Sequence, residues 1–351
     1  MRPGRDSSLP PRARLVSYIP VRFSGLTLAS AWLVMMSAAG RSESGNITVY
    51  SGMCDASAVA ELDAGLFVAA DDEDNVLRIF DRAHPGMPVS QLDLSGFLQV
   101  DERAPETDLE GAARIGNRIY WITSHGRNAK GKERPNRQRF FATEIIAKDG
   151  RPSLVPSGIA YRQLLRDLAS DPRLARFNLA AAAEKAPKES GAMNIEGLSA
   201  MPDGRLLIGF RNPIPEGKAL LVPMLNPDAV IGGAPARFGD PILLDLGGLG
   251  IRGIEFERDR HVIIAGPYNE GGAPRLYLWR GGDSAPLWLK EIDLTGFKPE
   301  ALLLIGESDS VRCELVSDDG TLSIDGKECK RLKDAALKRF RTLGVRLPLG
   351  P

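Results

Sequence analysis

Two short apolar segments joined by a turn recur along the chain. In the clearest copy, DLEGAARIGNRIYWITSHGR (residues 108–127), the segments are separated by Gly116-Asn117. Runs of five to seven apolar or alternating residues on either side of a tight turn are typical of β-hairpins. The pattern therefore predicts an all-β chain built from repeated hairpins.

Five copies of this unit align on the residue that opens the first apolar segment. The aligned residues are Ser57, Glu110, Glu196, Arg252 and Glu300, and a Gly or Ala follows each of them. Successive members lie roughly 50 residues apart, except for a longer step between Glu110 and Glu196. Such a period, with about four strands per unit, is the signature of a β-propeller. We expect five recognisable blades, with a sixth, degenerate blade as the alternative.

The sequence also predicts the bounds of the propeller and the segments that close, interrupt and follow it. The propeller should occupy residues 46–332, and the segment NITVYSG (residues 46–52) can add a strand to the last blade and close the ring. The long step between the second and third units contains a segment of helical composition, residues 161–186, which we interpret as an insertion. Residues 333–341 are predicted to form a short amphipathic helix in a C-terminal tail, residues 333–351.

Residues 1–39 have the pattern of a secretory signal peptide. A leader with five arginines precedes an apolar run, residues 26–39, that ends in small side chains. This run is shorter than the roughly 20 residues that a membrane-spanning helix needs. We therefore expect cleavage after Ala39 and a periplasmic or secreted protein; a retained N-terminal anchor is the alternative.

Charge and cysteine content narrow the partners. Without residues 1–39 the chain has 40 basic and 44 acidic residues, a net charge near −4. A nucleic-acid-binding domain is expected to carry a cluster of basic residues, so we exclude nucleic acid as a partner. We also expect the protein to be a monomer. Of the three cysteines, Cys313 and Cys329 are nearest in sequence to each other and form the candidate disulfide, unless their geometry in neighbouring strands forbids it.

The predicted strand order places many polar residues at one mouth of the channel. In a propeller, the loop that leads into each inner strand and the loop between the second and third strands open on the same face. The residues expected at that mouth are Asp55, Asp71, Asp72, Asp74, Asp108, Glu110, His125, Arg127, Asn194, Glu196, Arg211, Asn212, Arg252, Glu300, Asp318 and Asp319.

Three glutamates of the aligned set are candidates for chemistry. Glu110, Glu196 and Glu300 can hold a cation or act as a base, and His125 can transfer a proton near neutral pH. The alternative is structural, because a carboxylate at the start of an inner strand can accept hydrogen bonds from backbone N–H groups of a neighbouring blade.

The remaining candidates would bind an anion or a metal. The candidates for an anionic substrate are Arg127, Arg211, Asn212 and Arg252. The candidates for calcium are Asp71, Asp72 and Asp108. The alternatives are that the arginines only neutralise the acidic ring and that the acidic loop is only solvated. Trp279 and Trp288 are interpreted as aromatics that pack between blades rather than as a carbohydrate platform.

Several motifs resemble a known bacterial family. CDASA…FVAADDEDNVLRIF, DLEGAARIGNRIYWITSHGR, GFRNP…KALLVPM, AGP…RLYLW and CELVSDDG are similar to the family called domain of unknown function 3616, over roughly residues 48–332. The repeated Glu-Gly unit also resembles, more distantly, secreted propellers with phytase-like esterase activity. That second resemblance implies a phosphate ester and calcium but identifies no catalytic residue.

Two classes of function remain open from the sequence. The first is a binding module that holds an anionic small molecule or a cell-envelope component at the channel mouth. The alternative is a calcium-dependent phosphoesterase or esterase of the phytase-like type, which would be a hydrolase of ester bonds. We favour binding, because no pair of nucleophile and base can be read from the sequence and no Gly-x-Ser-x-Gly motif is present.

Overall fold

The computed structural model describes residues 45–63, 65–269, 271–306 and 311–347. The predicted signal peptide, residues 1–39, lies outside these ranges. Within them, no helix is both long enough and apolar enough to cross a membrane.

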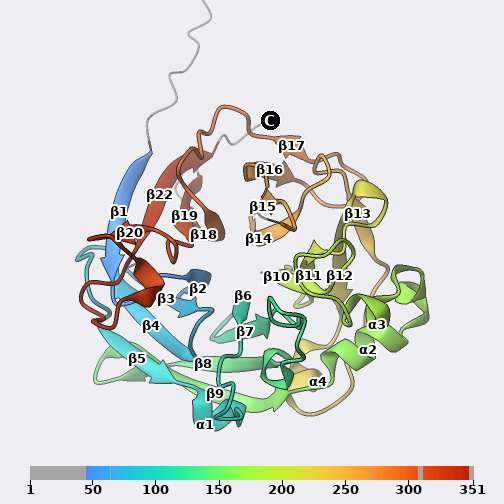
Figure 1. Cartoon of the computed structure of the whole chain (residues 1–351), viewed down its shortest axis with the longest axis horizontal. Helices are drawn as coiled ribbons and strands as arrows, with labels where there is room; N and C mark the ends of the chain where they lie inside the picture. Colours follow the sequence, from blue (N-terminus) through green and yellow to red (C-terminus); the bar gives the residue numbers. More distant parts are fainter. Residues whose placement is uncertain (1–44, 64, 270, 307–310, 348–351) are drawn as a thin grey trace, which may run out of the picture. The chain divides into compact units, whose positions relative to one another are not determined.

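Five four-stranded antiparallel sheets form the propeller, which confirms the number of blades expected from the aligned positions (Figure 1). From inner to outer strand, the first blade consists of β2 (Ala56–Glu61), β3 (Leu66–Asp71), β4 (Val76–Asp81) and β5 (Ser90–Asp93), and the second of β6 (Leu109–Ile115), β7 (Arg118–Thr123), β8 (Phe140–Lys148) and β9 (Arg151–Tyr161). In the same order, the third blade consists of β10 (Asn194–Ala200), β11 (Leu206–Asn212), β12 (Ala219–Met224) and β13 (Ile242–Leu244), and the fourth of β14 (Gly250–Glu257), β15 (Arg260–Gly266), β16 (Arg275–Trp279) and β17 (Leu287–Trp288).

The fifth blade joins the two ends of the described chain. Its strands, from inner to outer, are β18 (Pro299–Gly306), β19 (Val311–Ser317), β22 (Arg339–Leu347) and β1 (Asn46–Ser51). Strand β1 pairs antiparallel with β22 along its whole length, from Asn46 opposite Gly344 to Ser51 opposite Arg339. The segment at residues 46–52 therefore closes the ring, as predicted.

The helix predicted at residues 333–341 is wrong. Residues 335–337 form a turn, and strand β22 begins at Arg339. The physical reason is tertiary pairing: β22 lies between β19 and β1 and supplies the backbone partners of both. A local helical preference of a few tenths of a kcal/mol per residue does not compete with two complete ladders of hydrogen bonds.

The inner strands β2, β6, β10, β14 and β18 contact one another in sequence around the ring, and β18 returns to β2. The small residue that follows each aligned position permits this close approach. A Cβ atom on Gly111 would lie 2.9 Å from the Ile122 side chain and 3.1 Å from the Leu198 backbone. A Cβ on Gly253 would lie 2.7 Å from the Glu300 carbonyl oxygen.

Apolar contacts between adjacent blades make up the core. Where the first and fifth blades meet, Tyr50 packs against Phe67, Phe80 and Phe340 with ring centroids 5.2–5.4 Å apart. Such aromatic pairs add about 0.5–1.5 kcal/mol each beyond the area they bury. The closing strand β1 is therefore held by side-chain packing as well as by its ladder.

The helical insertion predicted at residues 161–186 is present. It consists of α2 (Leu164–Ser170), the 3₁₀ turn η2 (Pro172–Phe177) and α3 (Leu179–Ala182). Leu164, Leu168, Leu174 and Leu179 are buried in the same core cluster as the third blade. Short elements elsewhere are α1 (Ser95–Leu98), α4 (Pro227–Ile231), η1 (Pro135–Arg137), η3 (Pro215–Gly217) and η4 (Cys329–Arg331).

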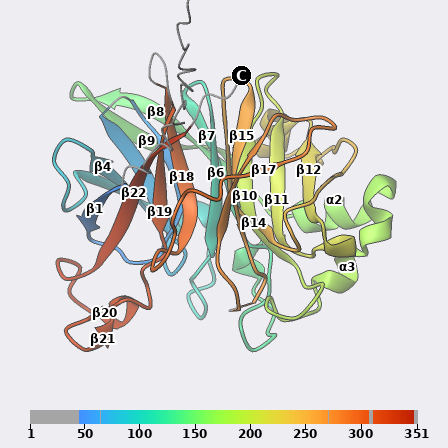
Figure 2. The same cartoon turned by 90° about the horizontal axis from the view of Figure 1, so that it is seen from above.

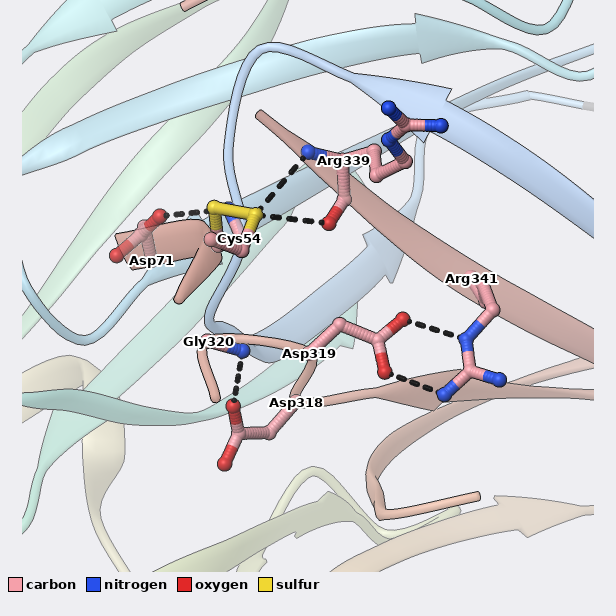
Figure 3. Close-up of a disulfide and its surroundings, with 8 residues drawn as sticks. Cys54, Asp71, Asp318, Asp319, Gly320, Arg339 and Arg341 are labelled. Carbon is pink, nitrogen blue, oxygen red and sulfur yellow. Dashed lines mark hydrogen bonds and ion pairs between the residues drawn. A yellow bond between two sulfur atoms is a disulfide. The ribbon is translucent and has the colours of Figure 1, made fainter. Parts of the chain in front are cut away.

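The disulfide joins Cys54 to Cys329 (Figure 3), so the candidate pair of Cys313 and Cys329 is not bonded. Cys313 is buried in β19 within the core between the fourth and fifth blades. Cys329 follows the small hairpin of β20 (Ser323–Ile324) and β21 (Lys327–Glu328), which projects beyond the blades in Figure 2. This excursion returns the chain to Cys54, with a Cα–Cα distance of 5.9 Å. Proximity in sequence was therefore a poor guide to the pairing.

Candidate functional site

A β-bulge occurs at the same place in all five inner strands. The pairing register skips one residue in each of β2, β6, β10, β14 and β18. The skipped residues are Ser57, Glu110, Glu196, Arg252 and Glu300, the five aligned positions of the sequence repeat. A bulge turns a side chain away from the regular alternation of a strand. The repeat thus positions one side chain per blade at the channel.

Arginine neutralises two of the three glutamates. Glu196 accepts from Arg211 Nη1 at 2.6 Å and lies 3.4 Å from Arg252 Nε, and Asn194 also donates to it at 2.9 Å. Arg252 forms a second ion pair with Glu300. One arginine therefore joins the carboxylates of the third and fifth blades across the fourth, which supports the structural interpretation of Glu196 and Glu300.

Glu110 has a different environment. Its carboxylate, that of Asp108 at the start of β6 and that of Asp72 after β3 each offer an oxygen within 4.8 Å of the other two. A second set shares Asp72 and adds Asp55 and Glu73. These groups come from loops of the first two blades, as the strand order predicted. The first two blades therefore place several carboxylates together at one mouth.

The pKa values of these carboxyls are raised by burial and by one another. Burial, then Glu196, Asp108 and Asp72, raise the pKa of Glu110 well above its ordinary value. Burial raises the pKa of Asp72 strongly, with contributions from Asp71 and Asp108. The positive charges nearby are therefore too few to offset the free energy that ionisation of these buried carboxyls costs.

Two neighbours of this set show the same effect. Burial raises the pKa of Asp108 to about 7, even though Arg137 Nη1 lies 2.9 Å from its carboxylate and favours the charged form. Burial, then Asp318 and Asp71, raise the pKa of Asp55 to about 8. Asp318 faces Asp55 in an isolated β-bridge, which brings the fifth blade against the first.

Three predicted site residues have supporting contacts instead. His125 is buried with Nδ1 2.7 Å from the Thr123 carbonyl oxygen, and burial lowers its pKa to about 4. Arg127 donates to the Ala183 carbonyl at 2.9 Å and forms an ion pair with Glu184. Asn212 donates to carbonyl oxygens of the segment that follows α3. The structure therefore does not bring these three side chains to the carboxylate set.

The acidic loop after β3 is divided between two roles. Asp71 accepts from the backbone N–H groups of Cys54 and Glu73, so it shapes the turn and is not a member of either ligand set. Asp74 forms an ion pair with Arg78 at 2.6 Å. Only Asp72 and Glu73 turn toward the candidate cation sites. Asp319 is likewise held by Arg341, at 2.7 and 2.8 Å (Figure 3).

Two basic residues at the mouth were not singled out from the sequence. Arg137 pairs with Asp108 and Glu106, and it lies in the basic loop of residues 126–139. Lys330 pairs with Glu73 at 3.0 Å and follows Cys329. The excess of positive charge in the loop was a usable signal for Arg137. No signal in the sequence indicated Lys330, because its position depends on the Cys54–Cys329 disulfide, which was not predicted.

Solved structures with a similar chain path are distant in sequence. The PQQ-bound form of aldose sugar dehydrogenase from Streptomyces coelicolor is 12% identical with a TM-score of 0.41, covering 86% of this chain and 99% of that one. The glutaminyl cyclase of Myxococcus xanthus is 10% identical with a TM-score of 0.41, covering 86% and 96%. No curated protein matches.

One family of sequences does match. Its model covers residues 55–151 and 148–287, which include the carboxylates of the first two blades and Glu196, Arg211 and Arg252. This agrees with the resemblance found in the sequence motifs. The chain belongs to the family described as "Protein of unknown function (DUF3616)".

Proposed function

We propose that this propeller binds a divalent cation, calcium, at one mouth of its channel and holds an anionic ligand through it. The supporting observation is the group of Asp72, Asp108 and Glu110, whose oxygens lie within 4.8 Å of one another. Calcium binds oxygen at about 2.3–2.6 Å, so two oxygens on one ion are at most about 5 Å apart. The three carboxylates fit that limit without rearrangement.

Charge supports the same conclusion. Three carboxylates this close repel one another, and the pKa of each is raised. A cation between them would remove the repulsion, because metal binding replaces the protons that otherwise neutralise the group. The neighbouring set of Asp55, Asp72 and Glu73 would extend the negative potential and attract the ion.

The class of ligand follows from the coordination positions of the cation that the protein leaves open. Calcium takes six to eight oxygens, and three carboxylates do not complete that number. A phosphate or carboxylate group of a small molecule or of a cell-envelope component would occupy the open positions. Arg137 and Arg211 flank the carboxylates and can contribute charge-assisted hydrogen bonds to such a group.

We also propose export and action as a monomer. The Cys54–Cys329 disulfide supports an oxidising compartment, where such bonds persist. The basic and apolar leader of residues 1–39 supports a periplasmic or secreted location.

Ester hydrolysis at the same cation is the less favoured alternative. It needs a group that moves a proton, and the sequence offered His125 for this role. Its Nδ1 is hydrogen-bonded to a backbone carbonyl and its pKa is lowered to about 4, which does not favour proton transfer near neutral pH. Calcium-dependent turnover of p-nitrophenyl phosphate by the purified protein would favour the hydrolase over the binding module.

Calorimetric titration of the chelated protein with calcium tests the cation site. We expect one calcium per chain, and at least about tenfold weaker binding in Asp72→Asn and Glu110→Gln. Inorganic phosphate should bind measurably only when calcium is present.

The matched control is Glu255→Gln. Glu255 lines the small central cavity that Glu110 also lines, and a second pocket beside the turn between β6 and β7. Burial raises its pKa to about 8, but it belongs to neither ligand set. Calcium affinity should be unchanged in this variant. Equal calcium binding by the parent chain and Glu110→Gln, or no calcium binding by the parent, would reject the proposed function.

A further inference from the structure

A groove with a volume of about 690 Å³ lies between the fourth and fifth blades. Strands β16 and β17, the segment that leads into β18, the turn after β19 and Arg341 of β22 line it. This volume is in the range of small-molecule sites, which is about 300–1,000 Å³. The groove lies outside the two carboxylate sets that would hold the cation.

Trp288 occupies the outer end of this groove. Its side chain is 38% exposed, whereas Trp279 and Trp121 are 2% and 0% exposed. The interpretation of Trp279 as a packing aromatic agrees with its burial, but Trp288 does not pack between blades. A large aromatic side chain in a concave, partly apolar surface marks a binding site, because the release of water from that surface to the bulk is favourable.

Two cations flank this tryptophan. The Arg275 guanidinium carbon lies 4.4 Å from the centroid of the Trp288 ring, and Lys290 Nζ lies 5.1 Å from it. In the described part of the chain, neither of them forms an ion pair with a carboxylate. Two positive charges beside an exposed aromatic ring favour a ligand that carries a negative charge.

The floor of the groove is apolar, and three acidic residues line it: Asp293, Asp318 and Asp319. The exposed Asp293 carboxylate accepts from the Thr295 backbone N–H at 2.9 Å. Leu276 and Phe297 are buried beneath the groove, and Ile292 and Leu322 line its walls. Asp319 is neutralised by Arg341 through two contacts of 2.7 and 2.8 Å. Asp318 lies at the inner end, where it faces Asp55 at the channel mouth. Arg275 and Lys290 make the end near Trp288 the one that favours an anion.

We propose that this groove binds a small organic anion with an apolar body, either a ring or an alkyl chain. The body would pack on Trp288 and over Phe297, and the carboxylate, sulfonate or phosphate would pair with Arg275 and Lys290. The site goes beyond the proposed function, because it does not use the calcium ligands and needs no cation.

A matched pair of fluorescent probes tests this proposal on the full chain in the presence of a chelator. The anionic probe is 8-anilinonaphthalene-1-sulfonate, and its uncharged counterpart is N-phenyl-1-naphthylamine. We expect one molecule of the anionic probe per chain, with quenching of Trp288 fluorescence, and at least about tenfold weaker binding of the neutral probe.

Variants assign the binding to the groove. Arg275→Gln combined with Lys290→Gln should weaken the anionic probe at least about tenfold and leave the neutral probe unchanged. Trp288→Ala should weaken both probes. Lys148→Gln, an exposed lysine in the outer hairpin of the second blade, is the control and should change neither.

Two results would overturn the proposal that the groove binds an organic anion. One is equal binding of the two probes by the parent chain; the other is unchanged binding of the anionic probe in the double variant. Addition of calcium in place of the chelator should leave probe binding unaltered. A failure of the calcium site would therefore be seen separately and would not count against the groove.

Discussion

One bulged residue per blade determines the chemistry of the channel. The same backbone irregularity presents Ser57, Glu110, Glu196, Arg252 and Glu300, but the side chains play different roles. Arg252 forms ion pairs with Glu196 and Glu300, whereas Glu110 faces other carboxylates. The close carboxylates therefore lie at the first two blades, and Arg211 of the third blade and Arg252 of the fourth compensate Glu196 and Glu300.

Replacing Arg252 with Met should destabilise the protein. Glu300 would lose its ion-pair partner in a buried position, and Glu196 would keep only Arg211. Removing one member of a buried pair costs about 3–5 kcal/mol, which urea denaturation at pH 7.5 would measure. Arg252→Lys keeps the charge and should lose less. An unchanged midpoint in Arg252→Met would show that the pair contributes no net stability.

Sequence reasoning at the residue scale succeeded where the repeat constrained it. The aligned column identified the bulged positions, and the strand order placed Asp72, Asp108 and Glu110 at one mouth. The sequence did not indicate that the loop after β7 brings the side chains of His125 and Arg127 into contact with backbone carbonyl oxygens. His125 has a φ of 55°, a left-handed conformation that the sequence pattern did not indicate.

At the scale of elements, an excursion in the fifth blade supports the mouth. The chain leaves β19 at Ser317, forms the hairpin of β20 and β21, and returns as β22. The disulfide joins this excursion to Cys54 (Figure 3), the residue before Asp55. The Asp319 backbone N–H also donates to the Cys54 carbonyl oxygen. The hairpin thus supports the position of Asp55.

Breaking this disulfide should lower stability and loosen the hairpin. A Cys54→Ser, Cys329→Ser variant is expected to lose about 2–4 kcal/mol in urea denaturation. The unfolded parent chain should show one free thiol, from Cys313, by reaction with an aromatic disulfide reagent. Dithiothreitol should destabilise the parent and leave the variant unaffected. Three free thiols in the untreated parent would contradict the assigned pairing.

Element prediction failed where the pairing was distant in sequence. Residues 333–341, which include the start of β22, were interpreted as a helix, and Cys313 was taken as the candidate partner of Cys329. Both errors concern residues whose partners lie at the other end of the chain, β1 for the strand and Cys54 for the disulfide. Local composition does not record such partners, and ring closure decides them.

For the molecule as a whole, buried and clustered carboxyls should make the free energy of unfolding depend on pH. The pKa of Asp71 is raised to about 6, that of Asp108 to about 7 and that of Asp55 to about 8, from 3.8. Between about pH 4 and 8 the folded chain therefore holds protons that the unfolded chain has released. This contribution to stability is complete below pH 4 and is lost as the pH rises to about 8.

The chelated protein should accordingly melt at least about 5 °C lower at pH 8.5 than at pH 5.5 in differential scanning calorimetry. Calcium should raise the melting temperature at pH 8.5 and have little effect at pH 5.5, because protons then occupy the ligands. Glu110→Gln should abolish most of the gain from calcium. A chelated protein that is more stable at pH 8.5 would contradict the raised pKa values.

The sequence by itself determined the architecture, because the regular repeat and its small residues record a constraint that every blade must satisfy to pack at the channel. It also aligned one residue of each blade at the start of the inner strand, and the structure shows that each of these residues is bulged. Only the tertiary structure decided the pairing of Cys54 with Cys329, the strand at β22 and the groove beside Trp288. It also decided which glutamates are neutralised. These features depend on contacts between segments that are distant in the chain, and local composition does not record such contacts.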